Sequence, residues 1–373
     1  MLRDHVPAAA RYAYLDHAAK GPLTRGAADS LRAYADDVVA HGGRNWPRWF
    51  GQIAEVRAKL AGLVGAVAGE IAIQPNTAAA IATVAEGIDW RPGDNVVVPA
   101  AEFPSNLFPW RHLQTRGVEC RAVGGHRGIG AVDLAAVDAA CDGRTRLIAC
   151  SWVGWGTGYR VDLDALCEIA DRRGARLLVD GIQAVGVRHL DLSETPIDFL
   201  AGECRKWLLS PEGLGYLFVR RERQDELRPS RVGWASMSQE DPFGDRFAFH
   251  DDARRFETGM PAFALVAAAN ASLGALAAET PAGREAVIGG LSERMVEVLT
   301  AAGGVVASER GDRGSAIVAA EFAGRDLEAM RSKMAEAGVV VSVRSGRIRV
   351  SPHAYNTAED VQKLADALKE AAG

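Results

Sequence analysis

The sequence predicts an α/β fold built on a mostly parallel sheet, and three stretches near the middle of the chain carry this prediction. Residues 177–179 form a short apolar run that ends on Asp180. A second apolar run, residues 197–201, is followed by Lys206, and two glycines open a third run at residues 216–219. Apolar runs without a polar face are typical of strands buried on both sides. An acid and a lysine at consecutive strand ends indicate a crevice at the carboxyl edge of the sheet, where open α/β folds bind ligands.

The chain before this stretch alternates strands and helices, as parallel strands joined by helical crossovers require. Residues 148–152 are expected to be a strand, and Asp162 and Gly174 mark the start and the stop of the helix that follows it. Hydrophobic spacing also predicts strands at residues 71–73 and 94–99, and helices at residues 25–40, 53–64 and 78–86.

The later part of the chain changes character. Residues 221–252 are polar and irregular and are expected to form a surface loop, and an alanine-rich helix is expected at residues 263–278. A second α/β unit follows, with strands at residues 317–321, 339–343 and 348–351 and helices at residues 327–337 and 358–368. We therefore expect a large domain of residues 18–258 and a small domain made of residues 1–17 and 259–373.

The bulk properties exclude several classes of protein. The composition, 48% hydrophobic and 24% charged, is typical of a globular protein. The formal net charge of -5 gives no basic footprint for nucleic acid, and no apolar run reaches the roughly 18 residues of a membrane span. The five cysteines lack a C-x-x-C pair, which argues against a metal site and favours a reducing cytoplasm. We therefore expect a cytoplasmic protein that acts on a small molecule.

Lys206 and Asp180 suit the chemistry of pyridoxal phosphate. That cofactor needs a lysine amine to hold it as a Schiff base, and a carboxylate beside its pyridine nitrogen to keep the ring protonated. Gln183, three residues after Asp180, could hydrogen-bond the ring hydroxyl. On spacing alone, Asp180 could instead cap the following segment, and Lys206 could be a surface lysine.

A phosphate cradle is expected at the turn between the strand at residues 71–73 and the helix at residues 78–86. Free N–H groups and the helix dipole both favour an anion at a helix N-terminus. Thr77 and the Ala78 amide lie at this turn. Thr77 could also be an ordinary N-cap, and the two roles are compatible.

These motifs resemble the class V aminotransferase-like family of pyridoxal phosphate enzymes, which includes cysteine desulfurases, kynureninases and isopenicillin N epimerase-like proteins. The family pattern is vD-x-x-Q, a lysine in a motif often read as HKW, and a P-x-G-x-G turn; this chain has VDGIQ, RKW and PEGLG. The resemblance extends from YLDHAAKGP near the start to RIRVSPHAYNTAEDV near the end. It implies fold type I, with a mostly parallel seven-stranded sheet in the large domain, a smaller C-terminal α/β domain, and a homodimer with shared active sites.

The resemblance assigns the cofactor contacts. Thr77 and Ala78 are expected to hold the phosphate, and Arg205, which stands where a histidine is common, is expected to clamp it. Phe103 aligns with the ring that stacks on the cofactor, although it could instead be a core residue. Asn106 aligns with an aspartate of kynureninase-like members and cannot act as a base.

The resemblance also assigns substrate contacts. Arg349 is expected to bind the substrate α-carboxylate, because a guanidinium meets both carboxylate oxygens at once; Arg344 and Arg347 are nearby alternatives. Trp155 replaces an asparagine of cysteine desulfurases and indicates a different substrate pocket. His17 is expected close to the substrate, or else only hydrogen-bonds the backbone.

Two stretches depart from the family pattern at positions that face the phosphate. Residues 253–261 match a motif usually read RFEaGTP, which reaches the neighbouring subunit's active site, but Met260 replaces its threonine and Thr258 could compensate. Glu203 stands where the family usually has a small hydroxyl residue or glycine. A carboxylate there would repel phosphate, so it either points away, pairs with Arg205 or acts as a base.

Two activities are disfavoured by spacing. Residues 344–347 alone join Val343 to Ile348, and no cysteine follows Cys204, so the chain is not expected to be a cysteine desulfurase by the usual cysteine-loop route. The glycines of VGWGTGYR lack the G-x-G-x-x-G spacing of a dinucleotide site, which disfavours a nicotinamide dehydrogenase.

The expected function is that of a pyridoxal phosphate enzyme acting on an L-amino acid through a Cα carbanion. Lys206 is expected to be the general base, and Asp180 is expected to hold the ring protonated. The preferred reaction is β-elimination by a lyase, in the manner of a C–S lyase. The alternatives are an aminotransferase and an isopenicillin N epimerase-like epimerase, whereas the intact Lys206, Asp180 and Gln183 argue against a non-catalytic protein.

Overall fold

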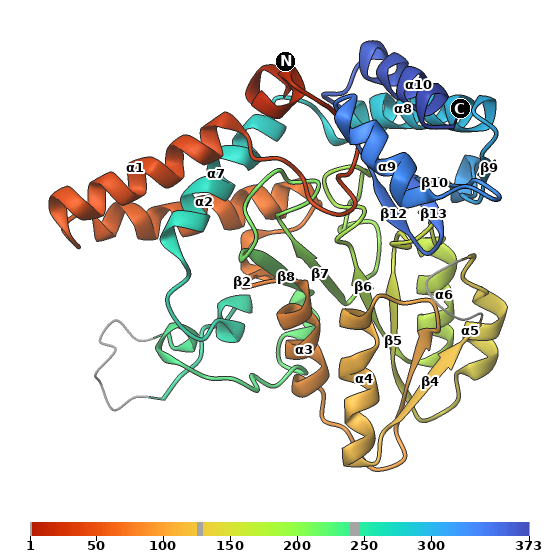
Figure 1. Cartoon of the computed structure of the whole chain (residues 1–373). Coiled ribbons are helices and arrows are strands. Elements are labelled where there is room, and N and C mark those ends of the chain that lie inside the picture. Colours follow the sequence, from red (N-terminus) through yellow and green to blue (C-terminus); the bar gives the residue numbers. More distant parts are fainter. Residues whose placement is uncertain (1, 125–129, 239–246, 373) are drawn as a thin grey trace.

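The centre of the computed structural model is a seven-stranded sheet with the strand order β2-β8-β7-β6-β5-β3-β4 (Figure 1). The model describes residues 2–124, 130–238 and 247–372. The strands are β2 (Ile71–Gln74), β3 (Asn95–Pro99), β4 (Glu119–Val123), β5 (Thr145–Ser151), β6 (Arg176–Asp180), β7 (Phe199–Glu203) and β8 (Gly215–Val219). β8 is antiparallel to both of its neighbours, and the other pairings of this sheet are parallel, so the predicted mostly parallel sheet is confirmed.

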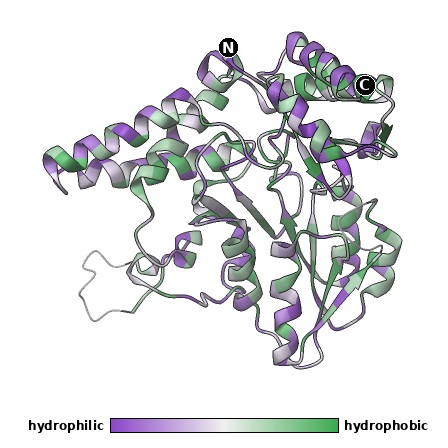
Figure 2. Cartoon of the chain, in the orientation of Figure 1, coloured by the Kyte–Doolittle hydropathy of each residue, from purple (hydrophilic) through white to green (hydrophobic). Residues whose placement is uncertain are grey.

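Helices cover both faces of this sheet. One layer contains α3 (Thr77–Gly87) and α4 (Phe108–His112), and the other contains α2 (Trp46–Leu63), α5 (Leu134–Ala140), α6 (Leu163–Arg173) and α7 (Phe263–Leu276). Alternate residues of a strand face alternate layers: in β6, Leu178 packs toward α3, and Leu177 and Val179 pack toward α6. The strands are mostly apolar and the outer faces of the helices are mixed (Figure 2), as a sheet buried on both sides requires.

Local capping signals fix where the helices begin. The Thr24 hydroxyl accepts a hydrogen bond from the Ala27 N–H at 3.1 Å and so caps α1 (Arg25–His41), which packs along α7 (Figure 1). The same hydroxyl lies 3.0 Å from the Ser272 hydroxyl of α7, which ties the start of α1 to the large core. α6 is capped by Asp162 and ends at Gly174 in the left-handed conformation, as the sequence predicted.

The C-terminal third forms a second sheet with the strand order β12-β13-β10-β9, all antiparallel. Its elements are α8 (Pro281–Ala301), β9 (Val305–Val306), β10 (Val318–Glu321), α9 (Leu327–Glu336), β11 (Val339–Val340), β12 (Ser342–Arg344), β13 (Arg347–Val350) and α10 (Ala358–Ala372). The chain start joins this unit, because β1 (Ala13–Tyr14) pairs in parallel with β11. A separate apolar core holds Leu15 with Leu291 and Leu368. The predicted domain boundaries at residues 17 and 258 stay a prediction.

Some expected elements differ in the structure. The strand expected at residues 339–343 is split into β11 and β12, because β11 pairs with β1 and β12 pairs with β13. α2 begins at Trp46, seven residues before the expected helix, and β4 and α5 were not predicted. Of the loop expected at residues 221–252, residues 239–246 lie outside the described residues.

In the described ranges, no single helix has both the length and the apolarity to cross a bilayer. Helices α7 and α8 reach the length and apolarity of a membrane span only when they are counted as one segment, and the pair is bent by 79°.

The burial of β7 predicts which apolar truncations destabilise the fold. Leu200 on β7 is fully buried in the large core, whereas Val39 on α1 is 88% exposed. We expect Leu200→Ala to lower the free energy of unfolding by about 3 kcal/mol, because it leaves a cavity in a packed layer. The matched variant Val39→Ala should change it by less than about 0.5 kcal/mol. Equal midpoints for the two variants in urea denaturation would contradict this assignment of the core.

Candidate active site

A cavity of about 330 Å³ lies at the carboxyl ends of β6 and β7, where the sequence predicted a crevice. Parallel strands end at one edge of a sheet, so residues that follow neighbouring strands are brought together there. The predicted site residues that line it are Thr77, Ala78, Phe103, Trp155, Asp180, Gln183, Arg205 and Lys206. The predicted residues His17, Asn106, Thr258 and Arg349 are placed elsewhere, as described below.

Asp180 ends β6 at the floor of this cavity and is 3% exposed. Its carboxylate accepts a hydrogen bond from the Ile182 N–H at 3.0 Å. Burial raises the pKa of Asp180, while that N–H and the Lys206 ammonium oppose the rise and Glu203 adds to it. A cationic group bound beside Asp180 would therefore be matched by a carboxylate that has few other partners.

Lys206 follows β7 and is almost fully buried in the same cavity. Burial lowers its pKa most, and the guanidinium groups of Arg205 and Arg349 lower it further; Asp180 and Glu203 oppose them. An amine whose pKa is lowered in this way is available without its proton near neutral pH. It can therefore attack an aldehyde as a nucleophile or take a proton as a base.

The turn that carries Lys206 is held from behind by the segment before α1. The Gly21 N–H donates to the Arg205 carbonyl at 2.9 Å. A Cβ atom at Gly21 would lie 2.1 Å from the Lys206 carbonyl oxygen, so this close approach requires glycine. The glycine of YLDHAAKGP is thus a packing requirement of the lysine turn in this chain.

Gln183 joins the same two segments. Its amide nitrogen donates to the Ala18 carbonyl at 3.0 Å, and its amide oxygen accepts from the Trp207 indole N–H at 3.0 Å. The amide nitrogen carries a second hydrogen, and Gln183 lines the cavity. The hydrogen bond from Gln183 to a cofactor hydroxyl stays a prediction.

The predicted anion site lies at the N-terminus of α3. Asn76, and not Thr77, is the N-cap, because its side chain accepts from the Ala79 N–H at 2.8 Å. The buried Thr77 hydroxyl has no hydrogen-bond partner, and the first-turn N–H groups of Thr77 and Ala78 have none within the helix. Gly215 of β8 permits this arrangement, because a Cβ there would lie 2.9 Å from the Asn76 Cα.

Arg205 borders this anion site and is already engaged. One guanidinium nitrogen donates to the Ala19 carbonyl at 2.9 Å, and its Nε lies 3.1 Å from the Glu203 carboxylate. Of the three options left open for Glu203, the structure therefore shows pairing with Arg205, and Glu203 also lines the cavity.

Phe103 and Trp155 form one wall of the cavity. Their ring centroids are 5.9 Å apart with an interplanar angle of 75°. Phe103 is 44% exposed and is therefore not a core residue, so its stacking role stays open as predicted. Asn106 is fully buried beneath this wall, where its side-chain oxygen accepts from the Trp110 indole N–H at 3.1 Å. Its predicted cofactor contact stays a prediction.

Arg349 lies on β13 directly behind that wall. It donates to the Trp155 carbonyl at 2.6 Å and to Asp16 at 3.4 Å, and its Nε has no partner. The Arg349 charge also lowers the pKa of Lys206. Arg344 is exposed and Arg347 pairs with Glu321, so these two alternatives are directed elsewhere.

His17 is fully buried behind the lysine turn, outside the cavity lining. Its two ring nitrogens contact the Ser351 carbonyl at 2.8 Å and the Tyr355 hydroxyl at 2.7 Å, and its ring stacks on Trp207 at 5.7 Å. Burial lowers its pKa well below the ordinary value, and His353 adds to this effect. Its placement favours support of the Trp207 ring; the substrate contact stays a prediction.

Thr258 and Met260 border a neighbouring hollow of about 300 Å³, which shares Gly213 with the candidate site. The chain before them is anchored by Glu257, which accepts from the Ile73 N–H at 2.7 Å and forms an ion pair with Arg57. The phosphate contact predicted for Thr258, which involves a neighbouring subunit, stays a prediction.

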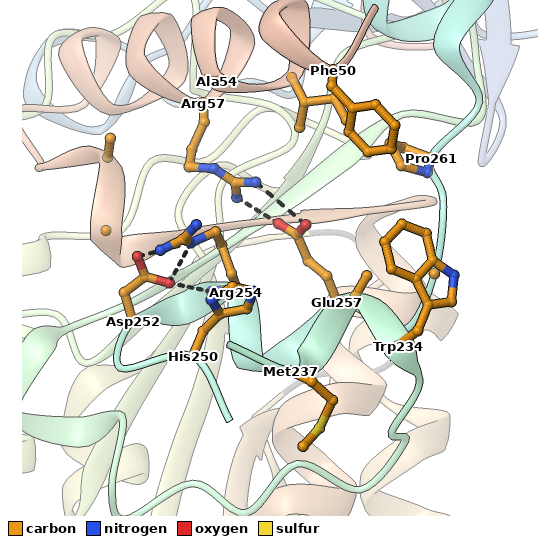
Figure 3. Close-up of a pocket in the computed structure, with 15 residues that line it drawn as sticks. Phe50, Ala54, Arg57, Trp234, Met237, His250, Asp252, Arg254, Glu257 and Pro261 are labelled. Carbon is orange, nitrogen blue, oxygen red and sulfur yellow. Dashed lines mark hydrogen bonds and ion pairs between the residues drawn. The ribbon is translucent and has the colours of Figure 1, made fainter. Parts of the chain in front are cut away.

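The Arg57–Glu257 ion pair also forms the base of a larger hollow of about 600 Å³ (Figure 3). Phe50, Trp234 and Pro261 lie along one side of it, as Figure 3 shows. This hollow contains none of the lysine-site residues, and both charged groups at its base are already paired. Asp252 and Arg254, which also line this hollow, form a second ion pair.

One buried acid was missed in the sequence. Glu102 follows β3, and its carboxylate accepts from both the N–H and the hydroxyl of Ser151 at 2.5 Å. Ser151 lies beside Asp180 across the β5–β6 pair. Burial raises the pKa of Glu102 to about 7, Ser151 and Asn106 oppose the rise, and Asp180 adds to it. Its position just beyond an apolar strand is the signal that identified Asp180 and could have identified Glu102.

Together these groups fit pyridoxal phosphate. The unpartnered Thr77 hydroxyl and the α3 N-terminus suit its phosphate, Asp180 suits a protonated ring nitrogen, and the neutral Lys206 amine suits its aldehyde. The misfit is Glu203, whose negative charge lies among the groups that would face the phosphate.

Comparison with known proteins supports the same family. The profile described as aminotransferase class-V matches residues 13–364, which confirms the resemblance seen in the motifs. A probable cysteine desulfurase of Methanothermobacter thermautotrophicus is 34% identical over 263 residues, which cover 69% of this chain and 63% of that protein. Isopenicillin N epimerase of Streptomyces clavuligerus is 35% identical over 213 residues, which cover 54% of this chain and 53% of that protein. The chain therefore spans less than two thirds of either relative.

Solved structures share the fold. The complex between the cystine C-S lyase C-DES and its reaction product cysteine persulfide superposes with a TM-score of 0.90 at 22% identity, covering 98% of this chain and 99% of that chain. The predicted fold type is thereby confirmed.

These comparisons overturn one expectation. The chain was expected not to be a cysteine desulfurase, because the β12–β13 turn is short and lacks a cysteine. That exclusion is wrong, since the relatives include proteins named as cysteine desulfurases. The short β12–β13 turn argues only against sulfur transfer through a cysteine on that turn. Cleavage of a carbon–sulfur bond depends on other groups as well, and the chain has the predicted ones, Lys206, Asp180 and Arg349.

The charges around Lys206 predict how its reactivity responds to pH. The Asp180 carboxylate favours the ammonium form, so Asp180→Asn should lower the pKa of Lys206 further, by about one unit. Reductive trapping of Lys206 by pyridoxal, followed by peptide mapping across pH, measures this shift, with the exposed Lys333 as an internal reference. A midpoint that moves to higher pH would refute the charge assignment.

Glu102 predicts a pH dependence of stability. Its pKa is raised from 4.5 to about 7 in the folded chain, so its contribution is complete below 4.5 and is lost as the pH rises through about 7. The variant Glu102→Gln has no carboxyl group to ionise, so it does not lose this contribution to stability as the pH rises. Over that interval the variant should gain up to about 3 kcal/mol in free energy of unfolding relative to the wild type. Chemical denaturation across pH measures it, with the exposed Glu336→Gln as control, and parallel curves for wild type and Glu102→Gln would contradict the prediction.

Proposed function

The chain belongs to the class V aminotransferase family, and from that premise we propose that it is a lyase that cleaves the Cβ–S bond of an L-amino acid by β-elimination. Its cofactor is pyridoxal 5′-phosphate. When bound, this cofactor supplies an electron sink for the pair of electrons left at Cα. The chain's own residues supply the binding, the orientation and the movement of protons.

The observation that carries the proposal is the buried Lys206 amine, whose pKa is lowered by burial and by two guanidinium groups. An unprotonated amine in a cavity with Asp180 can take the Cα proton of an amino acid. The resulting ammonium group lies close to Asp180, which stabilises it. The same proton can then be given to the leaving sulfur atom.

Arg349 is proposed to orient the substrate. Its unpartnered Nε and its position behind Trp155 support recognition of an α-carboxylate. Asp16 accepts from both Arg349 and the Ser342 hydroxyl, which fixes the guanidinium. A carboxylate held there would keep the amino acid beside the Lys206 amine.

Sulfur as the leaving atom is supported by the cavity wall and by one relative. Phe103 and Trp155 offer aromatic edges and faces, with which sulfur makes favourable contacts. The 34% identical relative is named as a probable cysteine desulfurase. In the proposed reaction, the thioether or disulfide substituent leaves as a thiol or persulfide, and one water converts the remaining three-carbon unit into pyruvate and ammonium.

Two other reactions begin with the same proton transfer. Return of the proton to the opposite face of Cα is epimerisation, which the isopenicillin N epimerase relative supports. Delivery of the proton to the cofactor carbon is transamination, which the family name supports. A second base on the far side of Cα would favour epimerisation, and among the residues that the structure describes the cavity lining contains no second lysine or histidine.

A homodimer with shared active sites in the cytoplasm completes the proposal. Phe50 and Trp234 are exposed large apolar residues that line the hollow of Figure 3, and the exposed Met260 lines the neighbouring hollow, which supports burial by a second copy. The five free cysteines support a reducing compartment.

Product analysis tests the reaction. The loaded protein is incubated with L-cysteine, L-cystine and S-alkylcysteines, and we expect pyruvate and ammonium in equal amounts with a sulfur product. A keto acid that retains the side chain would instead establish transamination. Exchange of the Cα hydrogen with loss of optical purity would establish epimerisation, and either result would overturn the lyase proposal.

A matched pair of variants tests the role of Arg349. Arg349→Lys should raise KM for the amino acid about tenfold or more, because a lysine cannot bind both carboxylate oxygens, and should leave cofactor loading unchanged. Arg347→Lys, on the same strand but paired with Glu321, is the control. Equal KM values for the two variants would contradict carboxylate binding by Arg349.

A further inference from the structure

Glu203 is a buried carboxylate of the cavity lining whose charge does not suit the phosphate of the cofactor. It is the last residue of β7 and lies opposite Gly215 in the antiparallel pair with β8. The Gly215 backbone in turn approaches Asn76, at the start of α3. The strand pairing therefore brings Glu203 to the side of the cavity lined by Thr77 and Ala78, the residues predicted to hold the phosphate.

The carboxylate is held there by Arg205. The Glu203 side chain is 7% exposed and the Arg205 side chain is 30% exposed, with Glu203 Oε1 3.1 Å from Arg205 Nε. A second nitrogen of Arg205 donates to the Ala19 carbonyl. The guanidinium therefore has a fixed place beside the anion site, and the edge that could face a phosphate is shared with Glu203.

The electrostatic consequence follows from the charges. A phosphate monoester carries about -1.5 to -2 charges near neutral pH. Glu203 is close enough to the site to raise the pKa of Asp180 and that of Lys206. A carboxylate and a phosphate at one guanidinium compete for it, because the negative charge of each weakens the attraction of the other.

We propose that Glu203 competes with the cofactor phosphate for Arg205, so that loading of pyridoxal phosphate requires the Glu203–Arg205 ion pair to open. Glu203 is thus a positioning residue that acts through Arg205 and weakens the hold on the cofactor. The inference rests on the cofactor of the family and not on the lyase reaction proposed above.

The experiment measures cofactor affinity without any substrate. Cofactor-free protein is titrated with pyridoxal phosphate, and binding is followed by the visible absorption of the cofactor and by quenching of tryptophan fluorescence. Glu203→Gln keeps the shape of the side chain and removes its charge, and it should tighten binding about tenfold. Glu203→Ser, which introduces a small hydroxyl, should also tighten binding and serves if the first variant folds poorly.

Two controls separate competition from other effects. Glu212→Gln also removes a carboxylate from the cavity lining, but Glu212 pairs with Lys20 at 2.8 Å and is mostly exposed, so its effect should stay below about twofold. Pyridoxal, which lacks the phosphate, should gain much less than tenfold from Glu203→Gln, because only the small effect of Glu203 on the Lys206 amine remains. A similar gain with pyridoxal would show that the effect does not arise at the phosphate.

A double-variant cycle decides the role of Arg205. If Glu203 acts by occupying Arg205, the gain from Glu203→Gln should disappear in an Arg205→Gln background. A gain that persists there would overturn the proposal and indicate direct repulsion of the phosphate. Weaker binding by Glu203→Gln would also overturn it, because Glu203 would then hold Arg205 in place for the phosphate. A failure of lyase activity leaves these affinities unaffected, so the two proposals fail separately.

Discussion

The site depends on keeping the Lys206 amine buried beside Asp180. The large sheet makes this possible, because β6 and β7 are parallel neighbours whose ends meet at one edge. Burial lowers the pKa of the amine and raises that of the acid, so neither group is strongly solvated before a ligand arrives. A ligand that brings a cation to Asp180 and an aldehyde to Lys206 satisfies both groups at once.

The start of the chain connects this site to the second sheet. Gly21 packs against the carbonyl of Lys206, while β1 pairs with β11 in the C-terminal unit. Between these two contacts, Asp16 accepts hydrogen bonds from Ser342 and Arg349. The same short segment therefore contacts both the lysine turn and Arg349, which links the two ends of the sequence beside the cavity.

The sequence predicted the strands and site residues whose neighbours are close in the chain or whose motifs are distinctive. The strand ends at Asp180 and Lys206 were found because apolar runs mark buried strands. β4 was missed because this edge strand carries charged, partly exposed residues and lacks such a run. His17 and Glu102 could not be placed, since the partners that decide their roles, Tyr355 and Ser151, come from distant segments and follow no local spacing.

The central claim is that Lys206 holds the cofactor. The most direct test is the visible absorption spectrum of the purified protein after addition of pyridoxal phosphate, wild type beside Lys206→Ala. We expect the wild type to be yellow and to keep its absorption band on a desalting column, whereas Lys206→Ala should lose the cofactor absorption on the same column. The same retained band in both proteins would contradict the role of Lys206 as the amine that binds the cofactor.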